Sequence, residues 1–259
     1  GEVYAAEAQY RNSPRFAKDR LYWQNKTTDL PAPTSITGVL APPAARAHLC
    51  GGYLSDVTQR ALDRAADRLD SAFAPLAIAA VATFLARMTG NTDVVLSLPV
   101  AGRTTAVLRR SGGMVSNVLP IRVRITPQCT LATLVTDVQL ELTGALRHQR
   151  YRAEDIRRDA GGSTDTRGFF GPAINIMAYE SEVPFGPLTG EFNVLSTGPV
   201  EDLSVNIYPA TDGTRSRLEF EGNPNIYGIE QFETLHRRFL ALFEDFLTAD
   251  SRTPVLSLD

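Results

Sequence analysis

Residues 72–100 read AFAPLAIAAVATFLARMTGNTDVVLSLPV, and this stretch decides the fold. The part up to Met88 is apolar on every side, which predicts a buried central helix that ends at Gly90. The part from Asp93 to Val100 is a short β-branched run with almost no polar residue, which predicts a strand buried on both faces. A buried helix followed by a buried strand indicates helices layered on a sheet.

Four amphipathic helices are predicted on either side of this stretch. Ser13 is a polar N-cap with Pro14 at the first helical position, so PRFAKDRLYWQNKT is predicted to be a helix. Ser55 caps a second helix, whose apolar stripe is opposed by a solvated face of Asp and Arg. The third and fourth helices are predicted over Leu131–His148 and over Ile229–Phe246.

The remaining strands are predicted from alternation and from turn residues. Ile121–Ile125 alternates apolar and basic residues, which is typical of a strand with one covered face. Three more strands are predicted at Ala173–Ala178, Asp202–Tyr208 and Arg217–Glu221, with an Asp-Gly turn at Thr211–Gly213 before the last and an exposed loop at Gly161–Gly168. The predicted fold class is α/β, an α+β two-layer sandwich in which a mixed β-sheet is flanked by helices, with residues 1–259 as a single domain.

Composition excludes several classes of protein. The chain has 259 residues, 43% hydrophobic and 21% charged, with a net charge of -3 and no basic stripe, so no nucleic-acid partner is expected. The longest apolar run, 72–86, is shorter than the roughly 18 to 20 residues that a membrane span needs, so no membrane partner is expected. No signal peptide follows Gly1, and a cytoplasmic location is predicted.

The cysteines and histidines give no catalytic or metal site. Cys50 and Cys129 are far apart without zinc spacing, and both are predicted to be free thiols. His148 and His236 are predicted on helix surfaces. His48 lies near Cys50 in a predicted loop, where a Cys/His pair could activate a thiolate, but adjacency in a loop is weak evidence for that role. No metal site is predicted.

One dense group of residues lies between Asp93 and Arg124. Pro99, Gly102 and Arg103 follow the buried strand, where backbone can approach a ligand and an arginine can hold a carboxylate. Asn117 is a polar residue in an apolar context, so it should either carry a hydrogen-bonding role or form a turn by satisfying its own backbone.

These residues resemble the condensation domain of nonribosomal peptide synthetases. DVVLSLPVAGR (93–103) resembles the family motif D-x-V-x-G-x-P-x-A-G-R, and GGMVSNVLPIRV (112–123) resembles G-x-x-x-N-x-L-P-L-R-V. SPRFAKDRLYWQN (13–25), VEDLSVNIYP (200–209) and the closing helix with its exit (237–259) also resemble family segments in order and spacing. Ser97 departs from the first motif, which usually has Gly at that position.

The resemblance implies a chloramphenicol-acetyltransferase-like lobe, one of two in the family's domain. The family's catalytic motif, His-His-x-x-x-Asp-Gly, belongs to the first lobe, and no His-His pair occurs in this sequence. The chain therefore resembles the C-terminal lobe alone, and no catalytic residue is predicted in it. The resemblance implies that Arg103 pairs with the Asp of that motif across the lobe interface, so that it is unpaired in isolation. Substrate-tunnel or lobe-interface positions are implied for Pro99, Gly102, Arg103, Asn117, Asn175 and Asp202, with a segment around 201–203 crossing to the first lobe.

Two functions are predicted from different classes. In the first, the chain completes an amide-forming enzyme whose substrates ride on the phosphopantetheine of peptidyl carrier proteins, with no cofactor bound directly, an N-terminal lobe as partner and an adenylation domain downstream. In the second, it is a catalytically silent module that recruits other proteins. If it is severed from a partner lobe, apolar surface near Val94, Val100 and Val118 is predicted to be exposed.

Overall fold

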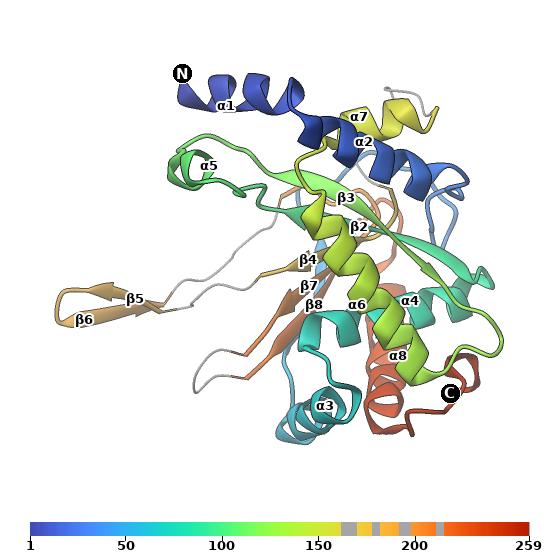
Figure 1. The fold of residues 1–259 in the computed structure, drawn as a ribbon. Coiled ribbons are helices and arrows are strands. Elements are labelled where there is room, and N and C mark those ends of the chain that lie inside the picture. Colours follow the sequence, from blue (N-terminus) through green and yellow to red (C-terminus); the bar gives the residue numbers. More distant parts are fainter. Residues whose placement is uncertain (162–169, 178–181, 192–197, 211–214, 259) are drawn as a thin grey trace.

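A six-stranded sheet crosses the centre of the molecule, with its strands in the order β1-β8-β7-β4-β2-β3 (Figure 1). The computed structural model describes residues 1–161, 170–177, 182–191, 198–210 and 215–258. β2, β4 and β7 are parallel to one another, and the other pairs in this sheet are antiparallel. The prediction of a mixed sheet flanked by helices is therefore confirmed. The strands of the sheet are β1 His48–Tyr53, β2 Asp93–Val100, β3 Asn117–Arg124, β4 Ala173–Ile176, β7 Leu203–Tyr208 and β8 Arg217–Gly222.

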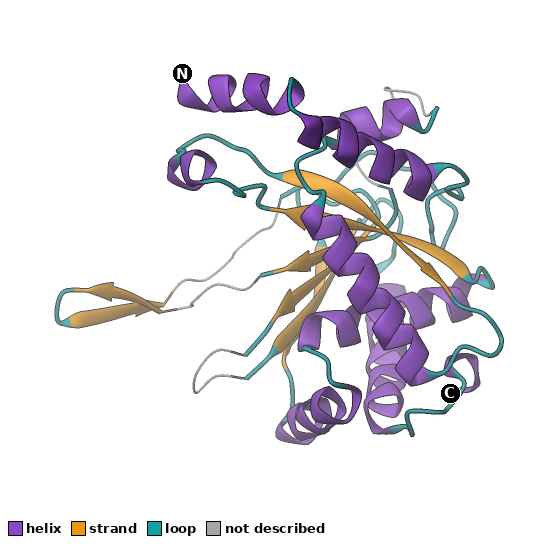
Figure 2. Ribbon diagram, in the orientation of Figure 1, coloured by secondary structure: helices purple, strands orange, loops and turns teal. Residues whose placement is uncertain are grey.

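One group of helices packs on one face of the sheet, and the two N-terminal helices lie beyond its β3 edge, at the top of the view (Figure 2). Val205 of β7 lies opposite Phe220 of β8, and the Phe220 ring packs 4.7 Å, between centroids, from Phe239 of α8. The helices are α1 Glu2–Arg11, α2 Pro14–Thr27, α3 Asp56–Leu69, α4 Phe73–Thr89, α5 Ala106–Arg110, α6 Leu131–Arg147, α7 Ala153–Asp159 and α8 Ile229–Thr248, followed by a short 3-10 helix at Val255–Ser257.

α4 is the most deeply buried helix that the sequence predicted. Of its 17 residues 13 are buried, and Phe84 packs edge-on against Phe239 of α8. The helix ends as predicted at Gly90, which has a φ of 72° and donates its backbone N–H to the carbonyl of Ala86. No single described helix has the length and apolarity needed to cross a membrane. Only α3 and α4 taken together meet both criteria among the described helices, and this pair is bent by 100°.

Local signals fixed several element boundaries. α2 begins at Pro14 and ends at Thr27, as predicted, and the Ser13 hydroxyl accepts the N–H of Phe16. The predicted hairpin of β7 and β8 is present, with Tyr208 opposite Arg217. Its Thr211–Gly213 turn and most of the predicted loop at Gly161–Gly168 lie outside the described residues.

Other elements were not predicted. α1, α5 and α7 were missed, as was β1, so His48 and Cys50 lie on an edge strand rather than in a loop. A separate hairpin of β5 Glu182–Phe185 and β6 Leu188–Glu191 pairs only with itself and stands away from the rest of the ribbon (Figure 1).

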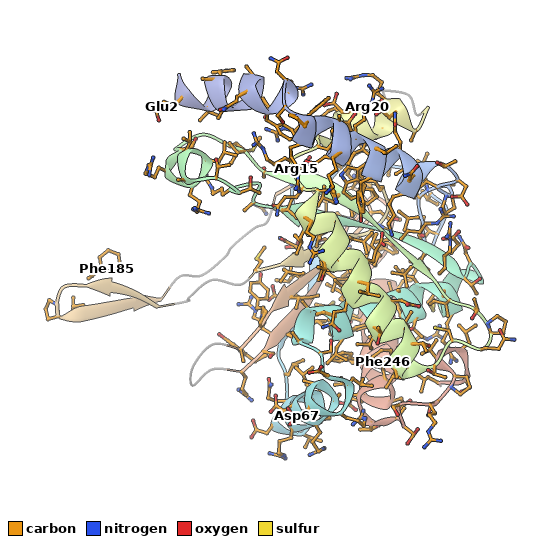
Figure 3. All side chains as sticks on the ribbon, viewed as in Figure 1. Glu2, Arg15, Arg20, Asp67, Phe185 and Phe246 are labelled. Carbon is orange, nitrogen blue, oxygen red and sulfur yellow. The ribbon has the colours of Figure 1, made fainter. Side chains whose placement is uncertain are left out.

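The predicted exposure of three valines is wrong. Val94 is fully buried, Val100 is 9% exposed, and Val118 is half-buried, because the β2–β3 pair is covered on both faces within this chain. The exposed large apolar side chains lie elsewhere, among them Leu40, Met114, Phe185 and Leu188. Figure 3 shows Phe185 projecting from the β5–β6 hairpin.

The predictions for two histidines are also wrong. His148 follows the last turn of α6, where its Nδ1 lies 2.7 Å from Asp19 Oδ1 and its ring stacks on Tyr22 at 4.0 Å between centroids. His236 of α8 is 9% exposed and packs against Phe220, and its Nε2 has no hydrogen-bond partner among the described residues. His148 is half-buried and His236 is buried because α2 and β8, which are distant in sequence, pack against them.

His236 predicts a pH-dependent stability. Burial lowers its pKa from the ordinary 6.5, so the unfolded chain binds the proton more readily than the folded one. The contribution of neutral His236 to the free energy of unfolding is complete above about pH 6.5. It is lost as the pH falls from there toward the pKa of His236 in the folded chain. We expect His236→Leu to reduce the loss of unfolding free energy between pH 7.5 and 5.5, measured by urea titration. An unchanged slope in His236→Leu would contradict the assignment.

Candidate functional site

Four predicted site residues gather at one edge of the sheet. β2, β4 and β7 run parallel, so their C-terminal ends meet at this edge, which is where open sheets commonly carry ligands. Pro99 lies near the end of β2, Gly102 and Arg103 follow it, and Asn117 begins the paired strand β3 opposite Val100.

Gly102 and Arg103 tie the loop after β2 into a rigid unit. Gly102 is buried with a φ of 65°, and a Cβ on it would lie 2.2 Å from the carbonyl oxygen of Val115. The Arg103 guanidinium donates to the carbonyl oxygens of Leu108 and Ser111, each at 2.7 Å, and to that of Gly113 at 3.2 Å. The half-buried Arg103 therefore donates its hydrogen bonds to the loop of its own chain. No carboxylate pairs with it among the described residues.

Asn117 joins β3 to the connection between α6 and α7. Its Nδ2 donates to the carbonyl oxygens of Gln149 at 2.9 Å and Tyr151 at 2.8 Å. Its Oδ1 accepts the N–H of Ala153 at 2.9 Å. Asn117 is 7% exposed, so these bonds replace the water that its amide would otherwise need. Its role is the hydrogen-bonding one, and the alternative of a turn that satisfies its own backbone is wrong.

β2 and β4 meet at one point and then part. Ser97 pairs with Ala173, and no further pairing joins these two strands. The fully buried Ser97 hydroxyl accepts the N–H groups of Phe170 at 2.7 Å and Gly171 at 3.2 Å, which a glycine could not do. Ser97 therefore fastens the entry of β4 to β2, and the C-terminal halves of the two strands diverge beyond it.

Asn175 belongs to a polar row that the sequence analysis did not identify as a whole. It lies in register with Asn206 of β7, and Asn206 lies in register with Glu219 of β8. All three point to the face opposite the one that contacts α8, because Val205 and Phe220 alternate with them. The sequence already indicated this position of Asn206, because Leu203, Val205 and Ile207 were predicted on one face of the strand and alternation places Asn206 on the other.

Asp202 lies at the opposite edge of the sheet, directly before β7. It accepts the hydroxyl of Tyr227 at 2.5 Å, and burial raises its pKa above the ordinary 3.8. Its neighbour Val200 forms a bridge with Ala44. The structure thus separates Asp202 from the group around Gly102.

A charged cavity lies apart from the predicted residues. Its volume is about 370 Å³, between α2, β3 and α6. Arg122 at its wall forms ion pairs with Asp93 at 2.6 Å and with Asp29 at 2.7 Å. The Arg122 guanidinium lowers the pKa of both carboxyl groups through these hydrogen bonds. Within the described part of the chain, no group of three or more His, Cys, Asp or Glu side chains could hold a metal ion.

Comparisons with known proteins point to one family. The family model described as "Condensation domain" matches residues 2–254. An isonitrile lipopeptide synthase of Streptomyces coeruleorubidus is 36% identical over 95% of this chain, and a dimodular nonribosomal peptide synthase of Bacillus subtilis is 33% identical over 93%. The chain spans only 17% and 10% of the length of these two relatives.

Solved structures agree with the sequence relatives. The first condensation domain of the calcium-dependent antibiotic synthetase, in complex with a substrate analogue, has a TM-score of 0.83 and 37% identity. The starter condensation domain of rhizomide synthetase RzmA has a TM-score of 0.87 and 32% identity. The match covers 98% and 100% of this chain and 56% and 58% of those chains, so this chain spans somewhat more than half of each.

Proposed function

This chain belongs to the condensation domain family, and from that membership we propose that it is the C-terminal lobe of a nonribosomal peptide synthetase condensation domain. One observation carries the proposal: the match takes in nearly all of this chain but only 56–58% of each solved domain. The remainder of such a domain is long enough to be a second lobe. No His-His pair occurs in the 259 residues, so the motif His-His-x-x-x-Asp-Gly would belong to that other lobe.

The proposed reaction is amide formation between two carrier-bound substrates. The acceptor amine attacks the carbonyl carbon of the donor thioester, a C–N bond forms, the C–S bond breaks, and the phosphopantetheine thiol of the donor carrier leaves with a proton. A histidine of the other lobe would orient the amine and remove its proton, which contributes through positioning and general-base catalysis. This chain would supply the opposite wall, which holds both thioesters in line and excludes water. Alone it would be inactive.

We assign the wall to the edge where β2, β4 and β7 end. Pro99, Gly102 and Arg103 would form its rigid loop, Asn117 would fix that loop to the helices, and Asn175 would face the substrate. The Arg103 side chain supports this assignment, because it is held by three carbonyl oxygens and none of its described contacts neutralises its charge. An Asp of the first lobe could then pair with it without breaking an existing ion pair.

The segment between β4 and β7 is the best candidate to cross to the first lobe. Its β5–β6 hairpin stands away from the body in Figure 1 and exposes Phe185 and Leu188 at 64% and 70%. Exposed apolar side chains on a projecting element indicate a surface that is covered in the complete domain. This refines the expected crossing at 201–203, because Leu203 already lies in the central sheet. Asp202 would anchor the return of the crossing segment.

The test is condensation with donor-loaded and acceptor-loaded carrier proteins, followed by intact-protein mass spectrometry. We expect no product from this chain alone and product when it is mixed with the upstream half of the same synthetase, expressed separately. Replacing the second histidine of the upstream motif by alanine should abolish the product while the two halves still co-elute in size exclusion. Product from this chain alone would overturn the assignment of the catalytic groups.

The same experiment separates the enzyme from a recruitment module. A folded, co-eluting pair of halves that forms no amide would favour the catalytically silent alternative. The carrier proteins, the phosphopantetheine-borne substrates and a downstream adenylation domain are parts of this proposal, since the curated relatives are multifunctional synthetases much longer than this chain.

A further inference from the structure

Asn206 is a fully buried amide that has no hydrogen bond. Its side chain lies in the middle of β7 with 0% exposure, and neither Oδ1 nor Nδ2 has a partner among the described residues. A buried donor or acceptor without a hydrogen-bond partner destabilises the folded state, so an unpartnered buried amide requires an explanation.

Among the described residues, the two other buried asparagines are fully bonded. Asn223 also has 0% exposure, and its Nδ2 donates to the carbonyl oxygens of Pro42 and Glu201, each at 2.9 Å, while its Oδ1 accepts the N–H of Asn225 at 2.9 Å. Asn117 likewise bonds through both amide atoms. The fold therefore provides partners for a buried amide where the amide is structural, and Asn206 is the exception among these three.

The residues beside Asn206 on the adjacent strands make no hydrogen bond to its side chain. Glu219, opposite it in β8, is bound by the guanidinium of Arg217, whose Nε donates at 2.7 Å. Asn175, opposite it in β4, makes no hydrogen bond to it. On the far side of Glu219 stands Gly51, which has no side chain to offer.

The location of the polar row suits a ligand. Asn175 and Asn206 lie on the sheet face that α8 does not contact, and Asn175 is on the strand that parts from β2 beyond Ser97. Tyr208 is the next residue of β7 on the same face, and the Arg217 guanidinium lies 4.9 Å from the centre of its ring. This aromatic and cationic pair borders the row at the edge where β2, β4 and β7 end.

The chemistry of the row favours an uncharged group that can both donate and accept, such as an amide. A carboxylate can only accept and an ammonium can only donate, whereas the Asn206 amide needs one partner of each kind. Because Arg217 already neutralises Glu219, a charged ligand would find no free counter-charge in the row. A trans amide points its carbonyl oxygen and its N–H in opposite directions, so one amide can either donate to Oδ1 or accept from Nδ2 of Asn206.

We propose that Asn206, with Asn175 beside it, is a specificity-determining residue that binds an amide group of the carrier-borne substrate. The inference rests on the proposed function for the source of that amide, which is either the pantetheine arm or the acyl group that it carries. The bound amide donates its N–H to Oδ1 of Asn206 and sets how far the thioester reaches along the wall. A substrate without an amide at that distance leaves Asn206 unpaired and is disfavoured by about tenfold or more.

The binding test uses the full 259-residue chain and side-chain amide NMR. We expect the Asn206 NH₂ resonances to shift on addition of millimolar pantetheine if the arm is recognised, or of N-acetylalanine methylamide if the acyl group is recognised. The ester analogue of each compound keeps the carbonyl but has no N–H to donate to Oδ1, so it should shift them less. Equal shifts with the esters, or no shift with either amide, would overturn the proposal, as would a bound water that no ligand displaces.

A matched pair of variants separates a ligand-binding role from a structural one. Asn206→Leu keeps the volume and removes an unmet polar group, so we expect its unfolding midpoint to rise by about 2 to 6 °C while amide binding weakens about tenfold. Asn223→Leu removes three hydrogen bonds and should lower the midpoint instead. A lowered midpoint in Asn206→Leu would mean that Asn206 is structural and would refute the proposal.

Turnover distinguishes this inference from the proposed function. In the reconstituted pair of halves, Asn206→Leu should lower kcat/KM for the amide-bearing substrate about tenfold and change it little for the ester analogue. Equal kcat/KM values for the variant and the wild type in an active pair would overturn the inference alone. An inactive wild-type pair whose Asn206 resonances still shift with the amide would overturn the condensation activity and leave the binding site standing.

Discussion

Asn117→Leu should lower the free energy of unfolding by about 3 to 4 kcal/mol, because three buried backbone groups lose their partners at once. The carbonyls of Gln149 and Tyr151 and the N–H of Ala153 cannot bond to a leucine, and the 7% exposure of the site keeps water from replacing it. Urea unfolding followed by circular dichroism measures the change. Because Asn117 fixes the start of β3 to the start of α7, hydrogen exchange should accelerate most at the amide groups of 149–159.

The control for this variant is Asn225→Leu. Asn225 is exposed and its Nδ2 makes one bond of 3.2 Å to the carbonyl of Pro42, so its replacement should cost less than about 1 kcal/mol. Asn117→Asp retains the acceptor for Ala153 but faces two carbonyl oxygens with a charge, and it should be about as destabilising as the leucine. A cost below 1 kcal/mol for Asn117→Leu would show that the backbone groups find other partners.

Asp19→Leu is expected to cost about 3 to 5 kcal/mol and to release the two N-terminal helices. The Asp19 carboxylate is 1% exposed, accepts the hydroxyl of Tyr10 at 2.8 Å, and forms ion pairs with Arg15 Nε at 2.8 Å and His148 Nδ1 at 2.7 Å. It therefore joins α1, α2 and the end of α6 through one side chain. Limited proteolysis should cut the variant first near Ser13, between α1 and α2, while the wild type resists under the same conditions.

Tyr10→Phe tests whether these contacts act as one unit. Alone it removes a single bond, and we expect a cost of about 1 kcal/mol. Combined with Asp19→Leu it should add almost nothing, because its partner is already gone. Strictly additive costs would mean that the helices are held mainly by the apolar contacts of Trp23 and its neighbours. Burial and the Asp19 carboxylate both raise the pKa of Tyr10, so the titration of Tyr10 in Asp19→Leu is a second readout.

The family and most of the layer architecture could be predicted from the sequence because their signals are local. Ser13 and Pro14 define the start of α2, Gly90 ends α4, and the alternation of Leu203, Val205 and Ile207 defines a strand. β1 was hidden because its HLCGGY sequence contains two glycines, which adopt φ values of 119° and 156° and weaken any strand signal.

Contacts between distant segments could not be predicted in the same way. His148 and His236 occupy positions that are polar in the sequence, and only the packing of α2 and β8 against them buries their rings. Arg103 resembles a family residue that pairs with a carboxylate, yet which carbonyl oxygens it holds depends on how the 108–113 loop folds back. Asn206 went unnoticed because its lack of partners is a property of three strands together.

The placement of α4 also constrains how the chain is made. α8, which covers part of α4, ends at Thr248, 159 residues after α4 ends at Thr89. A ribosome that adds about 5 to 20 residues per second would need roughly 8 to 30 seconds to deliver α8 after α4. During that interval an alanine-rich helix, of which 13 residues are buried in the folded chain, lacks its cover, so nascent chains of this protein should be clients of ribosome-associated chaperones until the last helix emerges.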